Sequence, residues 1–288
     1  MKQFIEKVYK HFLITQDNWC NIPESQFLTS QYRKYENKQY KEKYIEQYYL
    51  LKYAPIYFEE YYEIYCEFLK YYKKDNIKVL SIGIGSGLDF WGFTEAVVDL
   101  NKTISIDYMG IDLVDWHYRF DSIRFLQKSL EDLTYDDFNN FTYGQANVII
   151  FPKSIIEIDK KLIQKFANLL VKSLKNKIFD DANLWFLISY IKKGDKVSGL
   201  DKFKIIYDIF IEHGYKLKHG DINKVEYSIN KDSKISYPID YKYSWMQDIK
   251  NYCNSKCNQS QINRCNLVDQ YPMLNKKHIA YGIYNFTR

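Results

Sequence analysis

The pattern of apolar and polar positions changes near residue 77. Before it, apolar and aromatic residues recur at spacings of three and four with Glu and Lys between them, which predicts helix over residues 3–15 and about 25–74. Pro55 is expected to break the second segment into two helices. We therefore predict a helical N-terminal cap over residues 1–76, which is not an independent domain. The tyrosines that recur along its helices are expected to pack into a core.

From residue 78 onwards, short apolar runs alternate with amphipathic segments. The apolar runs predict strands at 78–83, 105–113, 122–130, 146–151, 183–191, near 215–220 and at 279–286. The segments between them predict helices over 88–101, 159–176 and 198–215, with Gly214 as the stop of the third. This alternation indicates an α/β domain over residues 77–288, with a Rossmann-like, mostly parallel sheet and helices on both faces.

An insertion at about 221–278 interrupts the alternation before the last strand. Cys253, Cys257 and Cys265 lie there among Asn, Gln, Ser and Lys, a setting that suits a zinc or iron–sulfur site. Their spacing matches no strong zinc pattern, and unliganded thiols or a disulfide form the favoured alternative. A fourth ligand would come from His278, Asp269, His219 or Cys20, or a three-thiolate cluster would leave one iron open.

Composition places the chain among soluble globular proteins, with 46% hydrophobic and 27% charged residues. No apolar run approaches the roughly 20 residues of a membrane span, and the first residues lack signal-peptide features. Because no membrane span is expected, we predict no membrane partner. Five cysteines without a secretion signal predict a reducing, cytoplasmic setting. The 29 tyrosines could offer stacking surfaces for bases, but shared A/T-rich codons are the favoured explanation.

Positive charge gathers toward the C-terminus. The whole chain carries a formal charge of +5, whereas residues 214–288 hold 12 Lys and Arg against 6 Asp and Glu. This basic C-terminal quarter predicts a nucleic acid or another anionic partner, with an ordinary solvated surface as the alternative.

Three of the 11 glycines, Gly83, Gly85 and Gly87, follow the first predicted strand and precede a helix. Glycine permits positive φ and lets a ligand lie against the backbone, and the N–H groups of the helix N-terminus favour an anionic or polar ligand group. The dinucleotide fingerprint would place its third glycine at Leu88, and no Lys-Ser/Thr follows as in a P-loop. The turn therefore predicts a nucleotide-type ligand without a pyrophosphate.

This GxGxG turn resembles motif I of the class I S-adenosylmethionine-dependent methyltransferases, over roughly residues 77–219 and the final strand. The resemblance implies that the turn holds the methionine part of the cofactor. It also implies that Asp112, at the end of the second strand, binds both ribose hydroxyls and that Leu113 lies against the adenine. A functional segment after the fourth strand would begin at Phe151. The implied cofactor residues are Gly83, Ile84, Gly85, Ser86, Gly87, Asp112, Leu113 and Phe151.

The segment after the fourth strand departs from the family's Asn/Asp-Pro-Pro-aromatic motif, because the chain reads Phe151-Pro152-Lys153-Ser154. This departure removes the usual reason to expect methylation of a base amine. Candidate groups for acid–base work are Lys153, Ser154 and His117, with Asp115 and Glu157 also near. Each has a simpler interpretation: Lys153 is expected to face solvent, and residues 115–117 could cap and start a helix.

The sequence thus predicts S-adenosylmethionine-dependent methyl transfer to an unidentified acceptor, which could be a small molecule, RNA or protein. The alternative is a non-catalytic methyltransferase-like binding or assembly protein, with or without a Cys-ligated metal or iron–sulfur cluster.

Overall fold

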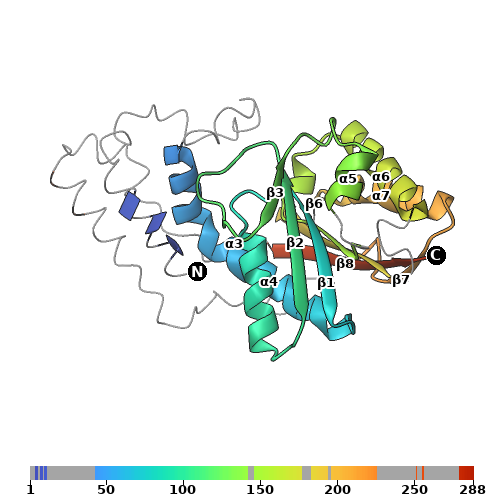
Figure 1. Ribbon diagram of the computed structural model, residues 1–288, viewed down its shortest axis with the longest axis horizontal. Coiled ribbons are helices and arrows are strands. Elements are labelled where there is room, and N and C mark those ends of the chain that lie inside the picture. Colours follow the sequence, from blue (N-terminus) through green and yellow to red (C-terminus); the bar gives the residue numbers. More distant parts are fainter. Residues whose placement is uncertain are drawn as a thin grey trace. The chain divides into compact units, whose positions relative to one another are not determined.

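The computed structural model describes the sheet, its helices and short parts of the remaining chain (Figure 1). The residues described are 4–5, 7–8, 10–11, 43–141, 146–176, 183–193, 196–225, 251, 255 and 279–288. They divide between two compact units, the first drawn from 1–57, 116–118 and 233–276, and the second from 58–115, 119–232 and 277–288.

Eight strands in the described residues form one sheet in the order β3-β2-β1-β4-β5-β8-β7, with β6 paired to β5. Strands β1 to β5 are mutually parallel, whereas β6, β7 and β8 run antiparallel to their neighbours. The order 3-2-1-4-5 is that of the Rossmann fold, so the predicted α/β class is confirmed. The strands are β1 (Asn76–Ile82), β2 (Ser105–Asp112), β3 (Arg124–Gln127), β4 (Val148–Phe151), β5 (Leu184–Lys193), β6 (Lys196–Ser198), β7 (Lys216–His219) and β8 (Ile279–Thr287).

Helices cover both faces of this sheet (Figure 1). On one face, α4 packs against the second half of α3, where the rings of Tyr65 and Phe93 stack with centroids 4.4 Å apart. On the other, α5, α6 and α7 enclose the larger core, in which Phe186 of β5 meets Phe203 of α7. The helices are α3 (Lys43–Tyr71), α4 (Leu88–Asp99), α5 (Tyr135–Phe141), η3 (Ser154–Ile156), α6 (Lys160–Lys175) and α7 (Leu200–Glu212).

Local sequence signals fix several helix ends as predicted. Asp159 caps α6 by accepting a hydrogen bond from the Lys161 N–H at 2.7 Å. Gly214 follows α7 with a φ of 84°, the left-handed conformation that glycine adopts at low cost. None of the described helices combines the length and apolar character that crossing a membrane would require.

The prediction that Pro55 divides the N-terminal segment into two helices is wrong, because α3 runs unbroken from Lys43 to Tyr71. An interior proline costs about 3 kcal/mol or more. The helix nevertheless buries one face on both sides of it, with Leu50, Ala54 and Phe58 all shielded from solvent. Burial of each large apolar side chain contributes about 1.5–3 kcal/mol, so the sum exceeds the proline penalty.

Residues 115–117, for which a helix start after β2 was one alternative, do not begin a helix. Positions 113–123 form bends and turns that lead directly into β3. The short strand β6 and helices α5 and η3 were not predicted, because three- to seven-residue segments carry too little periodic signal.

Gly92 sets how closely α3 and α4 approach. A Cβ at this position would lie 2.6 Å from the backbone nitrogen of Tyr62. The backbone of a helix cannot move away from such a contact as the end of a flexible side chain can. We predict that Gly92→Ala destabilises the protein by about 1–3 kcal/mol in urea denaturation, despite the better helix propensity of alanine. Val98→Ala in the exposed part of the same helix should change the free energy of unfolding by less than about 0.5 kcal/mol. A stabilised Gly92→Ala variant would contradict this close packing.

Candidate functional site

The candidate site lies at the carboxyl ends of β1, β2 and β4. Strand order reverses between β1 and β4, since β1 leads outward to β2 and β4 leads to β5 on the other side. Ligands of open α/β sheets bind at such a switch point, outside the carboxyl ends of the strands. Three of the segments predicted from the sequence meet this edge of the sheet: the glycine turn 83–87, Asp112 and the residues after Phe151.

The glycine turn depends on backbone conformations that other residues rarely adopt. Gly83, Gly85 and Gly87 have φ values of 72°, 56° and 84°. A side chain at Gly83 would collide with Ser154, and one at Gly87 would come within 2.5 Å of Ile123. At these two glycines the room left by the absent side chain is therefore filled by the protein itself, which fixes the turn between β1 and α4.

Most N–H groups of the turn are bonded within the protein, which agrees with the expectation that the turn does not suit a pyrophosphate. The N–H groups of Gly83 and Ile84 donate to the Ile111 carbonyl at 2.7 and 3.3 Å, and that of Gly87 donates to the Ile84 carbonyl. The N–H of Gly85 donates to the carboxylate of Asp112 at 2.8 Å. Four of the five amides in the turn are thus already bonded, and a phosphate would find few donors.

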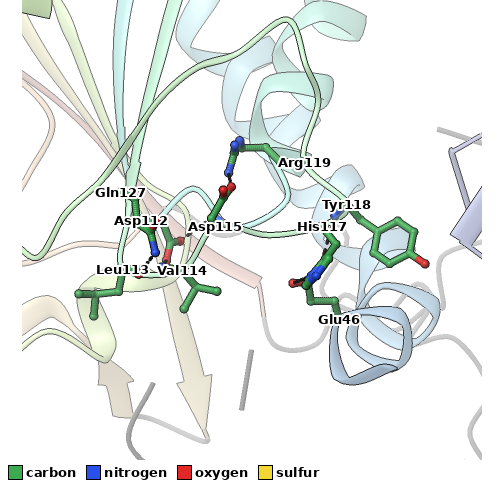
Figure 2. A network of polar contacts seen from close by, with 10 residues as sticks. Glu46, Asp112, Leu113, Val114, Asp115, His117, Tyr118, Arg119 and Gln127 are labelled. Atoms are coloured by element: carbon green, nitrogen blue, oxygen red, sulfur yellow. Dashed lines mark hydrogen bonds and ion pairs between the residues drawn. The ribbon is translucent and has the colours of Figure 1, made fainter. Parts of the chain in front are cut away.

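Asp112 closes β2 and points at the glycine turn. One oxygen accepts the Gly85 N–H, and the other accepts the Val114 N–H at 3.0 Å (Figure 2). Burial raises the pKa of this carboxyl, and the backbone N–H donors of Val114 and Gly85 oppose that rise. A carboxylate offers about four lone-pair positions, so two bonds hold Asp112 in place and leave acceptor capacity for a ligand diol.

The loop after Asp112 is held by side chains of its own unit. Gln127 donates to the Leu113 carbonyl at 3.2 Å, and Arg119 pairs with Asp115 at 2.6 Å (Figure 2). Leu113 is 43% exposed and so offers an apolar surface directly beside Asp112.

The acid–base candidate His117 belongs to the first compact unit, with Glu46 of α3. Its Nδ1 lies 3.0 Å from a Glu46 carboxylate oxygen (Figure 2). Glu46 is completely buried, burial raises its pKa, and it also accepts the Tyr118 N–H. His117 therefore serves as a partner for a buried carboxylate within that unit.

The expectation that Lys153 faces solvent is wrong. Its Nζ donates to Glu60 at 2.7 Å and to the Tyr190 carbonyl at 3.0 Å, and its side chain is only 13% exposed. Glu60 on α3 is buried and also accepts a hydrogen bond from Ser189 of β5, so the lysine supplies the countercharge that a buried carboxylate requires. Lys153 also has a φ of 61°, which is costly for a residue with a side chain.

Phe151, the last residue of β4, and Ser154 are likewise engaged. Ser154 donates its hydroxyl to the Ile82 carbonyl at the end of β1, which ties β4 to the glycine turn. The Phe151 ring is fully buried and meets Phe166 of α6 edge-on, so only its backbone could contact a ligand.

The predicted cysteine site lies outside the described residues, as do His278, Asp269 and Cys20. Within the part of the chain that is described, no three His, Cys, Asp or Glu side chains form a group that could hold a metal ion. His219 is described and packs against Tyr71 of α3, with ring centroids 4.2 Å apart and the rings tilted by 43°.

One polar group near the turn was not foreseen from the sequence. Asp89, in the first turn of α4, is fully buried and accepts hydrogen bonds from Ser81 and Tyr108. The only local signal was an acidic residue at a helix start, which by itself indicates favourable interaction with the helix dipole.

No protein-family model matches the chain, and no curated protein matches it. Among solved structures, the chain is similar to the plantazolicin methyltransferase BpumL in complex with SAH, at 11% identity over 99% of both chains and a TM-score of 0.42. It is also similar to a cyclopropane-fatty-acyl-phospholipid synthase-like protein from Lactobacillus casei, at 12% identity over 81% of this chain and 92% of that one, with a TM-score of 0.39. The sugar N-methyltransferase KedS8 from Streptoalloteichus sp. covers 48% of this chain and 56% of its own, at 10% identity and a TM-score of 0.31. Likeness this distant carries no information on chemistry, and the candidate site is defined by the strand order and the contacts above.

The Glu60–Lys153 pair gives a test of this geometry. We predict that Lys153→Met lowers the free energy of unfolding at pH 7 by about 3–5 kcal/mol, because it leaves the buried Glu60 carboxylate without its positively charged partner. Burial raises the pKa of Glu60, so folding takes up a proton at this carboxyl and the variant should lose stability as pH rises from 5 to 8.

Urea denaturation at several pH values would measure both effects. Adding Glu60→Gln to Lys153→Met should recover part of the loss and flatten the pH dependence. Lys161→Met, which removes an exposed lysine of α6, is the matched control. Equal stabilities of Lys153→Met and Lys161→Met would show that the pair is not formed.

Proposed function

We propose that the chain binds S-adenosylmethionine and transfers its methyl group to an acceptor. The observation that carries this proposal is the placement of Asp112 against the glycine turn at the switch point of the sheet, with its carboxylate held by the Gly85 and Val114 N–H groups. A carboxylate so held can accept both hydroxyls of a ribose, as the sequence resemblance to class I methyltransferases implies.

The residues at this edge suit the separate parts of that cofactor. Asp112 would take the ribose diol, and the exposed side chain of Leu113 would cover one face of the adenine. The backbone at positions 83–87 would support the methionine part, with Ile84 fixed by its packing over Gly110. When bound, S-adenosylmethionine supplies a methyl group already activated by its positively charged sulfur.

The role left to the protein in such a reaction is chiefly to orient the acceptor in line with the methyl group and to exclude water. A base is needed only for an acceptor that is protonated before transfer. The acceptor class stays open between a small molecule, RNA and protein, and the basic C-terminal quarter of the sequence favours an anionic one.

Isothermal titration calorimetry with S-adenosylmethionine and with SAH tests the cofactor assignment. We predict that both bind the wild-type chain. Asp112→Ala should weaken binding by about 10- to 100-fold, because the hydrogen bonds from the ribose hydroxyls to the charged carboxylate would be lost. Asp115→Ala removes a neighbouring exposed carboxylate and should leave the affinity within about twofold. Absence of binding to the wild type, or equal affinity of Asp112→Ala, would refute the proposal.

A second candidate is a methyltransferase-like protein that binds the cofactor or a partner without catalysis. It is favoured by one observation: Lys153 and Ser154, the candidate groups after β4, are committed to Glu60 and to the Ile82 carbonyl. Labelled methyl transfer from S-adenosylmethionine to fractions of a cell extract separates the two candidates. Incorporation into RNA, protein or small molecules above that of Asp112→Ala would exclude the purely non-catalytic role.

A further inference from the structure

The segment after β4 packs directly against the glycine turn. The hydroxyl of Ser154 donates a hydrogen bond to the carbonyl of Ile82, the last residue of β1. A Cβ added at Gly83, the next residue along the chain, would collide with the Cβ of Ser154. The two segments are thus in contact, and a close-packed interior transmits a displacement of one to the other. The position of Ser154 therefore helps to set the shape of the turn.

Lys153 places Ser154 there through a backbone conformation that lysine rarely adopts. Its φ is 61°, in the left-handed region, and it directly precedes the short helix η3. Among the described residues, the other non-glycine residue with a positive φ is Asn101, and asparagine adopts this region more readily. Such a conformation persists only where the surrounding structure imposes it, and it is found most often at functional sites.

A buried ion pair imposes this conformation from the side of α3. The Nζ of Lys153 donates to the Glu60 carboxylate at 2.7 Å and to the Tyr190 carbonyl at 3.0 Å. Glu60 is 1% exposed and also accepts a hydrogen bond from the hydroxyl of Ser189 in β5. The end of the lysine side chain is thus fixed to both α3 and β5, which leaves its backbone little freedom to relax.

The other side of η3 is held by α7. The Nζ of Lys202 donates a hydrogen bond to the Ile156 carbonyl. A Cβ at Gly199, the residue before α7, would lie 2.9 Å from the side chain of Ile155. The segment that carries Ser154 is therefore fixed on both sides as well as against the glycine turn.

Stability alone is a weak reason for this ion pair, because replacing a buried pair by apolar residues is often neutral or stabilising. We propose that Glu60 and Lys153 are positioning residues for the cofactor turn. This inference rests on the proposed function, and it assigns to the pair an action through Ser154 rather than contact with the cofactor. The pair holds Ser154 against Gly83, so that the turn keeps the shape in which it binds. The same turn carries the N–H group that orients Asp112, so its displacement would also misplace the acceptor of the ribose hydroxyls.

Calorimetric titration of the full chain with SAH tests this inference. The neutral pair variant, Glu60→Gln with Lys153→Met, leaves no buried charge without a partner. We expect it to bind SAH more weakly, on the order of 3- to 30-fold, at a temperature where urea denaturation shows it to be folded. The matched control is Lys160→Met with Asp201→Asn, which removes an exposed ion pair of the same unit and should change the affinity by less than about twofold. An unchanged SAH affinity of the neutral pair variant would show that the pair only stabilises the fold, and would overturn the inference.

A double-mutant cycle tests whether the pair acts through Ser154. Ser154→Ala removes the hydrogen bond to the Ile82 carbonyl and should weaken SAH binding to a similar extent. Added to the neutral pair variant, it should weaken binding further by no more than about twofold, because both changes disturb the same contact. Fully additive losses would show that the pair and the serine act independently, which contradicts the inference.

Glycine at position 153 separates the backbone conformation from the charge, because glycine adopts a positive φ at little cost. Lys153→Gly with Glu60→Gln should therefore bind SAH within about twofold of the wild type, although it lacks the lysine side chain altogether. An affinity as low as that of the neutral pair variant would show that the left-handed backbone is not what the pair secures, and the inference would fall. Failure of the wild type to bind SAH at all would instead refute the proposed function, and this inference with it.

Discussion

The hydrogen bond from the Gly85 N–H to Asp112 is the contact on which the candidate site depends. It joins the end of β2 to the turn after β1 and fixes the direction in which the carboxylate points. Burial of Asp112 is unfavourable to its charge, and two backbone donors are the compensation. An apolar residue at this position would leave the Gly85 and Val114 N–H groups without an acceptor, so the carboxylate stabilises the turn as well as offering acceptor capacity to a ligand.

Three carboxylates in the sheet unit, the buried Glu60 and Asp89 and the half-buried Asp112, differ in how their charge is met. Glu60 has a lysine and a serine, so its pair is complete and joins α3 to the ends of β4 and β5. Asp112 has two backbone N–H groups and spare acceptor capacity. Asp89 has the Ser81 and Tyr108 hydroxyls on one oxygen, and these bonds join β1 and β2 to the start of α4.

The features that the sequence could predict are those that depend on residues close together along the chain. The strand before the turn, the glycines and the position of Asp112 depend on neighbours within a few residues, and the structure places them as expected. The ion pair of Lys153 joins it to a residue 93 positions away, and no local pattern reveals it. The same holds for the turn amides, which are taken by Ile111 from another strand. The continuity of α3 through Pro55 likewise depends on burial of the helix face on each side of the proline, which a local rule for proline does not take into account.

The bonded amides and Asp112 together limit what the turn can accept. In a phosphate-binding turn the N–H groups face the ligand and carry most of the interaction. Here four of five amides are used internally, one of them by the Asp112 carboxylate. A pyrophosphate would meet a negative group and few donors, whereas a ribose diol would meet the remaining acceptor capacity of Asp112. The glycines therefore set the shape of this turn, and its bonded amides argue against a phosphate ligand.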